Sequence, residues 1–408
     1  MNIRPLITLV FALLLFFACN EEVSPPALTE VPVATEASGE PNLHIADGGE
    51  VFLTWVDYLN DTTDALVWAR LHEGSWTSPV TIAKGSDWFV NWADFPSLAK
   101  FKNSKSMAAH WLQMSAEGTY DYDIKVSISK DGGQNWNPPF TLHTDGVSAE
   151  HGFVSMVPLD DGRIFATWLD GRYMAGGHGD DHGHGGGPMT LRCATFDEAG
   201  KLYDEAELDG KVCECCTTAA VEIPGGVLVA YRNRSDEENR DIFYTRLHDG
   251  EWSNPKAVHN DNWHITGCPV NGPALAASGN TVAVAWFTAP EGEAKAQVAF
   301  STDAGKSFGK PIRIDDGNTI GRVDIVMNDA QTATVSWLEA VEKKAELRIR
   351  QINTDGSVND SQTIVETSAS RSSGFPRMVL NGDKLLFAWT EVDSVETRVR
   401  TGEVRLKD

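Results

Sequence analysis

A short apolar strand that ends in an aromatic residue recurs along the whole chain. In each copy, apolar or β-branched residues form a brief run, and a polar turn rich in Gly, Asp or Asn comes before it. The distance between successive aromatic residues runs from 51 to 63 positions, which is the scale of a four-stranded propeller blade. The seven aromatic residues are Trp55, Trp111, Trp168, Tyr231, Trp286, Trp337 and Trp389.

Each repeat predicts the same four strands. A first strand leads through a polar turn to the aromatic-ending second strand, and a variable loop, a third strand, a Gly-containing turn and a fourth strand follow. The period-two pattern and the turn residues between apolar runs leave little room for helices. The sequence therefore predicts an all-β protein that forms a single β-propeller with seven four-stranded blades.

The two ends of the chain predict how the ring closes. The last repeat, residues 375–408, has room for three strands only. Near the other end, the stretch Ala27–Ala37 contains the β-prone segment Val31-Pro-Val-Ala34. We expect this stretch to pair with the last repeat as its missing outer strand, because a closed ring leaves fewer unpaired strand edges.

Two turns between third and fourth strands carry a common motif of the form S-x-D-x-G-x-x-W, with Phe in place of Trp in the second. The motif residues are Ser129, Asp131, Gly133 and Trp136 in one copy, and Ser301, Asp303, Gly305 and Phe308 in the other. Shorter forms occur at 73–76, 249–252 and 355–356. In such a turn the Asp accepts backbone N–H bonds, and the Gly adopts a positive φ.

These turns resemble the Asp boxes of bacterial sialidases and related BNR-repeat propellers, and the resemblance extends over nearly all of residues 27–408. It implies the propeller fold and leaves the activity open, because Asp boxes are structural and one fold hosts many functions. Sialidases have six blades, so the predicted count of seven departs from the enzyme pattern.

The N-terminal residues predict export. Arg4 precedes an apolar run from Leu6 to Phe17 that is too short to span a membrane, as in a signal peptide. Cys19 directly follows Ala18, and this pair resembles a bacterial lipobox, which implies cleavage before Cys19 and lipidation of its thiol. A plain signal peptide with an incidental cysteine is the alternative.

The expected organisation is a signal peptide at 1–18, an anchor linker at 19–26 and the propeller at 27–408. The protein would then be lipid-anchored to the bacterial cell envelope, facing the periplasm or the cell surface. Its formal net charge of −24 argues against nucleic acid and against anionic membrane surfaces as partners, because both require a basic face.

The cysteines predict chemistry on one face. If Cys19 is lipidated, five cysteines remain, and an odd number cannot all be paired in intrachain disulfides. Cys193 lies inside a predicted third strand and is expected to be a small buried residue. The other four lie where the chain leads into the inner strands of repeats four and five, and they are Cys213, Cys215, Cys216 and Cys268.

Histidines accompany these thiols on the same predicted face. His264 lies on the loop of Cys268, and a Gly-rich loop of repeat three carries His178, His182 and His184. Thiolates with imidazoles are ligands for Cu(I) or Zn(II), so we predict a copper or zinc site at the four cysteines and His264, with the other histidines as a delivery loop. Disulfides among the cysteines and a reactive thiol remain open as alternatives.

The sialidase resemblance also implies three arginines that hold a carboxylate, a Tyr nucleophile assisted by Glu, and an Asp acid/base. The Arg-Ile-Pro motif of sialidases is absent where it is expected, because residues 39–43 read Gly-Glu-Pro-Asn-Leu. Asp123 repeats at the starts of other third strands as Asp64 and Asp241, which indicates a structural role. The remaining candidates on the predicted face are Arg232, Arg234, Asp236, Glu237, Arg322 and Arg371.

Two functions follow from these patterns. The first is a metal-binding accessory protein that carries copper or zinc and meets a metal-handling partner. The second is a carbohydrate-active propeller, either an exo-sialidase-like glycoside hydrolase or a glycan-binding protein. The sequence leaves open whether the protein is an enzyme.

Overall fold

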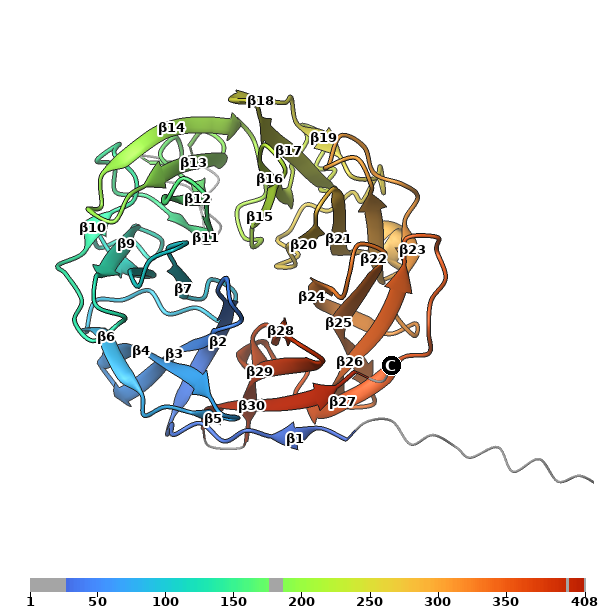
Figure 1. The fold of residues 1–408 in the computed structure, drawn as a ribbon. Helices are drawn as coiled ribbons and strands as arrows, with labels where there is room; N and C mark the ends of the chain where they lie inside the picture. The colour runs from blue at the N-terminus through green and yellow to red at the C-terminus, as the bar shows by residue number, and fades with distance from the viewer. Residues whose placement is uncertain (1–26, 176–185, 394–395, 407–408) are drawn as a thin grey trace, which may run out of the picture.

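The computed structural model describes residues 27–175, 186–393 and 396–406. These residues form seven antiparallel sheets arranged in a ring around one central axis (Figure 1). Two single turns of 3₁₀ helix, η1 (Pro290–Gly292) and η2 (Arg371–Ser373), are the helices among them. The predicted all-β, seven-bladed propeller is confirmed. No helix of the described residues is long and apolar enough to cross a membrane.

The strands of each blade follow one another along the chain from the axis outward. Blade 1 contains β2 (Ser38–Ile45), β3 (Val51–Asn60), β4 (Thr63–His72), β5 (Ser75–Trp76) and β6 (Val80–Gly85); blade 2 contains β7 (Ser97–Lys100), β8 (Met107–Met114), β9 (Tyr122–Ser129) and β10 (Phe140–Thr141). Blade 3 contains β11 (His151–Pro158), β12 (Ile164–Asp170), β13 (Thr190–Phe196) and β14 (Leu202–Asp209); blade 4 contains β15 (Ala219–Ile223), β16 (Gly226–Arg232), β17 (Ile242–His248), β18 (Glu251–Trp252) and β19 (Lys256–Ala257).

The remaining blades repeat the plan. Blade 5 contains β20 (Ala274–Ser278), β21 (Thr281–Thr288), β22 (Lys295–Ser301) and β23 (Ile312–Arg313); blade 6 contains β24 (Thr319–Met327), β25 (Thr332–Val341), β26 (Lys344–Asn353) and β27 (Gln362–Thr367). Blade 7 contains β28 (Arg377–Asn381), β29 (Lys384–Val392), β30 (Thr397–Arg405) and, from the other end of the chain, β1 (Thr29–Glu30).

The hydrophobic core lies between neighbouring blades. All seven recurrent aromatic residues lie in second strands and are buried. In the core between blades 2 and 3, for example, Trp168 packs with Ile124 and Phe196. Replacing such a residue with Ala in a packed core costs about 3 to 5 kcal/mol, so the aromatic repeat marks where the sequence fixes blade packing.

Ring closure follows the prediction. Thr29 of β1 is in register with Glu403 of β30, and Glu30 is in register with Gly402. The indole Nε1 of Trp76 in blade 1 also donates a hydrogen bond of 2.8 Å to Thr401 Oγ1 in blade 7. Figure 1 shows β1 running along the outer side of β30.

The Asp box at Ser129 has the geometry that its sequence predicts. Asp131 Oδ1 accepts hydrogen bonds from the backbone of Gln134 at 3.1 Å and of Asn135 at 2.9 Å. Gly133 has φ of 85°, and a Cβ there would lie 2.2 Å from the Trp68 ring of blade 1. The second box repeats the pattern, with Gly305 N donating to Ser301 Oγ at 2.9 Å.

Candidate functional site

Three of the predicted cysteines converge on the face of blade 4. They lie on the segment between β14 and β15, and the Sγ atom of Cys213 is 3.8 Å from that of Cys215 and 3.6 Å from that of Cys216. The side chains of Cys213 and Cys216 are buried. The segment is held beside blade 4 because Cys213 N donates to Arg232 O at 3.0 Å, at the end of β16. We call Cys213, Cys215 and Cys216 the thiol cluster.

Cys268 reaches the thiol cluster from the neighbouring blade. It lies on the loop before β20 and is exposed to solvent. Its thiol interacts with those of Cys213 and Cys215, and the contact with Cys213 and burial raise its pKa to about 12. All five cysteines among the described residues are free thiols, so the disulfide alternative is not formed in this structure.

A buried arginine compensates charge at the cluster. Arg240 Nη1 donates a hydrogen bond of 3.2 Å to Cys213 Sγ and lies 3.1 Å from Glu214 Oε2. Burial opposes ionisation of Cys213, but hydrogen bonds from the neighbouring thiols and the charge of Arg240 lower its pKa well below the usual range. Hydrogen bonds with the thiols of Cys213, Cys216 and Cys268, together with burial, raise the pKa of Cys215. Arg240 therefore favours the thiolate form of Cys213.

The predicted imidazoles are not part of the group of three sulfurs. His264 is exposed, and its Nδ1 lies 2.8 Å from Glu237 O. Its predicted role as a ligand stays a prediction. His178, His182 and His184 lie outside the described residues, as does Cys19.

Two of the predicted arginines contact backbone carbonyls. The Arg232 guanidinium donates to the carbonyl oxygens of Asn271, Arg240 and Phe287 at 2.6 to 3.0 Å. It also lies over the ring of Trp263. These bonds tie the end of β16 in blade 4 to blade 5.

Arg322 plays the same part between blades 6 and 7. Its Nη1 donates to Ser373 Oγ at 2.7 Å and to Gly374 O at 2.9 Å. Burial and the nearby charge of Arg371 lower the pKa of Arg322 to about 10. Arg371 itself is exposed.

The other candidates from the sialidase resemblance lie in the loop after β16. Arg234 pairs with Glu214 and with Glu238, the latter at 2.7 Å. Asp236 is exposed and pairs with Lys211 at 2.7 Å, and Glu237 is exposed. The guanidinium groups of Arg232, Arg234 and Arg322 are thus engaged with protein oxygens, whereas Arg371 is exposed. Arg232 and Arg322 lie on blades 4 and 6, and both contact Asn271 of the loop before β20.

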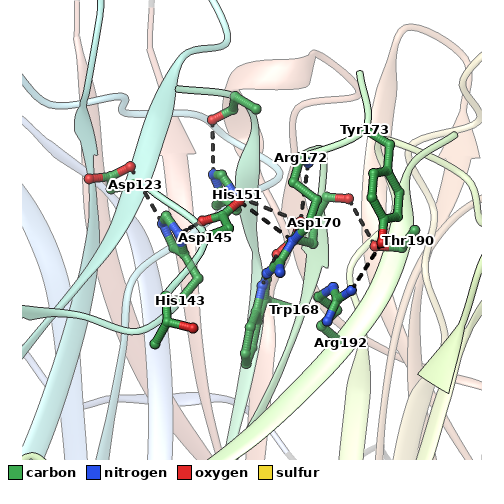
Figure 2. A network of polar contacts seen from close by, with 12 residues as sticks. Asp123, His143, Asp145, His151, Trp168, Asp170, Arg172, Tyr173, Thr190 and Arg192 are labelled. Atoms are coloured by element: carbon green, nitrogen blue, oxygen red, sulfur yellow. Dashed lines mark hydrogen bonds and ion pairs between the residues drawn. The ribbon is translucent and has the colours of Figure 1, made fainter. Parts of the chain in front are cut away.

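A second polar cluster lies where blade 3 meets blade 2 (Figure 2). Asp145 lies between two imidazoles, with its Oδ1 atom 2.6 Å from His143 Nδ1 and its Oδ2 atom 3.1 Å from His151 Nε2. The two rings stack with centroids 3.7 Å apart. Asp170 Oδ1 lies 3.7 Å from His151 Nε2, and Arg172 Nε donates to the same oxygen at 2.7 Å.

Strand register explains the convergence of this cluster. His151 begins β11 and Asp170 ends β12, and the two residues are partners in the antiparallel ladder. Tyr122 N of blade 2 donates to Ala149 O at 3.1 Å, which brings β9 and its Asp123 alongside. No sequence pattern singled out His143, Asp145, His151 or Asp170, and the repetition of Asp123 in other blades indicated a structural role.

A buried pair of acids lies next to this junction. Tyr122 OH donates to Glu150 Oε1 at 2.9 Å. Burial raises the pKa of Glu150 to about 8 and the pKa of nearby Asp94 to about 7. Negative charge at Asp94, Glu214 and Cys213 raises the pKa of Glu150 further.

The fold and these clusters define a sialidase-like propeller with its polar chemistry gathered on the loops of blades 2 to 5. A family model for the BNR repeat-like domain matches residues 59–386. The chain therefore belongs to the BNR repeat-like family. No curated protein sequence matches the chain.

Solved structures share the fold at low identity. An ulvan lyase from a new family of polysaccharide lyases is 12% identical, with a TM-score of 0.57, and the match covers 94% of this chain and 96% of that one. A protein of unknown function from Dyadobacter fermentans is 13% identical, with a TM-score of 0.55 over 93% of this chain and 98% of that one. The polysaccharide lyase Uly1 is 11% identical, with a TM-score of 0.54 over 90% of each chain. At these identities the likeness concerns the fold alone.

Proposed function

We propose that this protein binds a soft transition-metal ion, Cu(I) or Zn(II), at the thiol cluster, with Cys268 as a further thiolate. The observation that carries the proposal is the spacing of the three sulfur atoms. Thiolates about 2.3 Å from one tetrahedral ion lie about 3.8 Å apart, and the two distances from Cys213 Sγ are 3.8 and 3.6 Å. A disulfide would bring two sulfurs to about 2.05 Å.

The electrostatics of the loop support the same function. A site with three or four thiolates carries excess negative charge even with its metal, and burial makes that charge costly. Arg240 is buried and donates directly to Cys213 Sγ at 3.2 Å. Hydrogen bonding of this kind to a ligand atom orients the ligand and tunes its basicity.

Graded exposure of the ligands suggests that the ion is exchanged rather than locked in. Cys213 and Cys216 are buried, Cys215 is half-buried and Cys268 is exposed. A closed structural zinc site has no such open side. The protein would thus act as a metal-handling protein that receives or passes on its ion through Cys268.

The test is metal analysis of the full chain purified without reductant, together with a thiol count before and after reduction. We expect about one equivalent of copper or zinc per chain, and four thiols that alkylate only after the metal is removed. Four oxidised cysteines with no metal would contradict the proposal. Cys193→Ala is the matched control, because Cys193 is buried in β13 outside the thiol cluster.

A second candidate function is glycan processing, and the Tyr122–Glu150 hydrogen bond favours it. Sialidases use a Tyr nucleophile assisted by Glu, and here the two residue types are paired beside the acid Asp94. The Tyr122 ring itself is fully buried in the core between blades 2 and 3, so turnover would need this core to open. The test is hydrolysis of a fluorogenic sialoside by the full chain. Activity that Tyr122→Phe removes without altering metal content would support this candidate, and the absence of any turnover would reject it.

We further propose the envelope anchor predicted from the N-terminus. The lipobox-like pair Ala18-Cys19 is its basis, and a single acyl-bearing residue would tether the propeller through the linker at 19–26. Cys19→Ser should abolish metabolic lipid labelling and release soluble protein. Unchanged membrane association would contradict the anchor.

A further inference from the structure

The cluster in Figure 2 contains a set of nitrogen and oxygen donors that no part of the proposed thiol site uses. His151 Nε2, Asp145 Oδ2 and Asp170 Oδ1 lie within 4.8 Å of one another. Their side chains are 0%, 5% and 0% exposed. We call these three residues the His151 triad. Imidazole and carboxylate ligands suit divalent first-row cations, in contrast to the soft thiolates of blade 4.

Every member of the triad is oriented by a contact on its other polar atom. His151 Nδ1 lies 3.1 Å from Ala149 O, so an N–H there leaves the Nε2 lone pair facing the carboxylates. Asp145 Oδ1 is 2.6 Å from His143 Nδ1, and Asp170 Oδ2 accepts a bond of 2.9 Å from Trp168 Nε1. Backbone carbonyls and N–H donors of this kind are the usual outer partners of metal ligands.

The distances between the donor atoms of the triad match those between two ligands of one metal ion. Donors about 2.0 to 2.1 Å from one tetrahedral ion lie about 3.3 Å apart. His151 Nε2 is 3.1 Å from Asp145 Oδ2 and 3.7 Å from Asp170 Oδ1. An ion would need only small shifts of these atoms, because His151 and Asp170 are held as partners in the β11–β12 ladder and Asp145 is held by His143.

A guanidinium lies beside the position that a cation would take. Arg172 Nε is 2.7 Å from Asp170 Oδ1 and 3.5 Å from Asp145 Oδ2. Its Nη2 has other partners, Asp170 Oδ2 at 2.7 Å and Glu205 Oε1 at 3.2 Å. Arg172 can therefore release the two ligand oxygens and keep its outer contacts.

The cluster also contains more acceptors than donors. The buried Nε2 atom of His143 has no hydrogen-bond partner. It faces Asp123 Oδ1 at 3.4 Å. With the Nδ1–H of His143 directed at Asp145, two lone pairs face each other here, which is unfavourable unless positive charge is added to the cluster.

We propose that the His151 triad is a binding site for a divalent cation such as Zn²⁺ or Mn²⁺, with Arg172 as the internal cation that competes for the same oxygens. The site shares no ligand with the thiol cluster, and its nitrogen and oxygen donors suit Mn²⁺, which thiolates bind poorly. Removing Arg172 distinguishes a metal site from a purely structural cluster. If the triad is a metal site, the removal strengthens cation binding. If the cluster is only a strut between blades, removing Arg172 merely weakens the fold.

The experiment uses the full chain with all four candidate thiols removed (Cys213→Ser, Cys215→Ser, Cys216→Ser, Cys268→Ser) and titrates Zn²⁺ against a chromophoric chelator. We expect one Zn²⁺ per chain, binding about tenfold tighter in Arg172→Gln, since a nearby like charge shifts ion binding by a decade or more. Asp145→Asn should weaken binding at least about tenfold. Arg163→Gln is the matched control, because Arg163 pairs with Asp161 at 2.6 Å and Asp204 at 2.8 Å, away from the triad and from the partners of Arg172, and it should leave the affinity unchanged.

A second measurement avoids the cysteine substitutions. Mn²⁺ is a poor ion for thiolates, so the electron paramagnetic resonance signal of free Mn²⁺ should fall by one equivalent on addition of the wild-type chain. Asp145→Asn should restore that signal. The absence of binding of both ions, or an Arg172→Gln variant that binds no better than wild type, would overturn the proposal.

Discussion

The thiol cluster and the His151 triad occupy comparable places on neighbouring blades, and they differ in almost every property that governs metal binding. The thiol cluster sits on the loop before β15, where an exposed cysteine completes a buried set. In the triad, His151 and Asp170 sit at paired strand ends and Asp145 on the loop before β11, and the side chains are at most 5% exposed. Neighbouring blades thus carry soft, accessible donors where loops alone supply them, and hard, enclosed donors where two strand ends and a loop supply them together.

Charge compensation differs as well. At the thiol cluster Arg240 donates to a sulfur and leaves the other thiols free. At the triad Arg172 donates to the ligand oxygen itself, and hydrogen bonds from Arg172 and the charge of His151 lower the pKa of Asp170 although burial opposes this. Arg240 leaves most thiols of the cluster free to bind an incoming ion, whereas Arg172 already neutralises the carboxylates of the triad. We therefore expect faster exchange at the thiol cluster.

The largest effect is expected when the thiol cluster is removed. The double variant Cys213→Ser, Cys216→Ser should lose its equivalent of copper or zinc, because two of the three closest sulfurs are gone. Binding of Mn²⁺ at the triad should persist. Elemental analysis and Mn²⁺ titration of the same sample measure both, and simultaneous loss of both ions would show that the two sites are not separate.

Asp170→Asn removes the triad and keeps the thiol cluster. Asp170 is fully buried and accepts bonds from Arg172 and Trp168, so removing its charge takes from the mostly buried Arg172 guanidinium its closest carboxylate partner. We expect a loss of about 3 kcal/mol in the free energy of unfolding, measured by urea titration. The variant should bind no Mn²⁺ yet retain its copper or zinc. Unchanged stability would argue against the enclosed, charge-balanced site described above.

Cys268→Ser should change the rate of metal transfer more than the amount of bound metal. The exposed thiol is the natural first contact for a competing ligand, so we expect transfer of the ion to a small-molecule thiol chelator to slow by about tenfold. The metal content should fall less than in the Cys213→Ser, Cys216→Ser variant. Stopped-flow absorbance follows the transfer. A rate equal to that of wild type would assign the exchange to another ligand.

The smallest effect concerns the Asp boxes, which should influence neither metal. Partial burial opposes ionisation of Asp303, but hydrogen bonds from Ser301 and Ser307 lower its pKa from 3.8 to about 2. Its charged form therefore stabilises the fold at neutral pH, and this contribution is lost as the pH falls from about 4 to about 2. Asp303→Asn should flatten the acid dependence of the urea midpoint in that window. An unchanged acid profile would contradict this role.

The fold was predictable because a blade is a local unit. Its four strands are consecutive, so the aromatic repeat and the Asp boxes report the architecture without any long-range information. Even ring closure could be read, because the last repeat lacks a strand that Ala27–Ala37 supplies. The convergence of Cys213 with Cys216 was also predictable from their spacing.

The His151 triad was not predictable, and its residues show why. Asp170 follows Trp168 by two positions, and the same spacing recurs at Trp55 and Asp57 and at Trp337 and Glu339, where the carboxylate accepts the indole N–H. Asp170 therefore resembles a repeated structural residue. Only the register of β11 against β12 brings His151 opposite it.

The sequence also could not show whether the candidate arginines are available to hold a substrate carboxylate. Arg232 and Arg322 lie on the predicted face, but their guanidinium groups bind backbone carbonyls of neighbouring blades. A sequence gives the residue type and its approximate place on the ring, and the direction of a long side chain depends on the packing around it. Their direction could therefore be read only from the structure.

X-ray absorption spectroscopy on the wild-type chain loaded with one equivalent of Zn²⁺ tests the account most directly. The account predicts three or four sulfur scatterers at about 2.3 Å, because the thiol cluster binds the first ion. A shell of nitrogen and oxygen atoms at about 2.0 to 2.1 Å, without sulfur, would contradict the proposed function and place the ion with ligands of the kind found in the His151 triad.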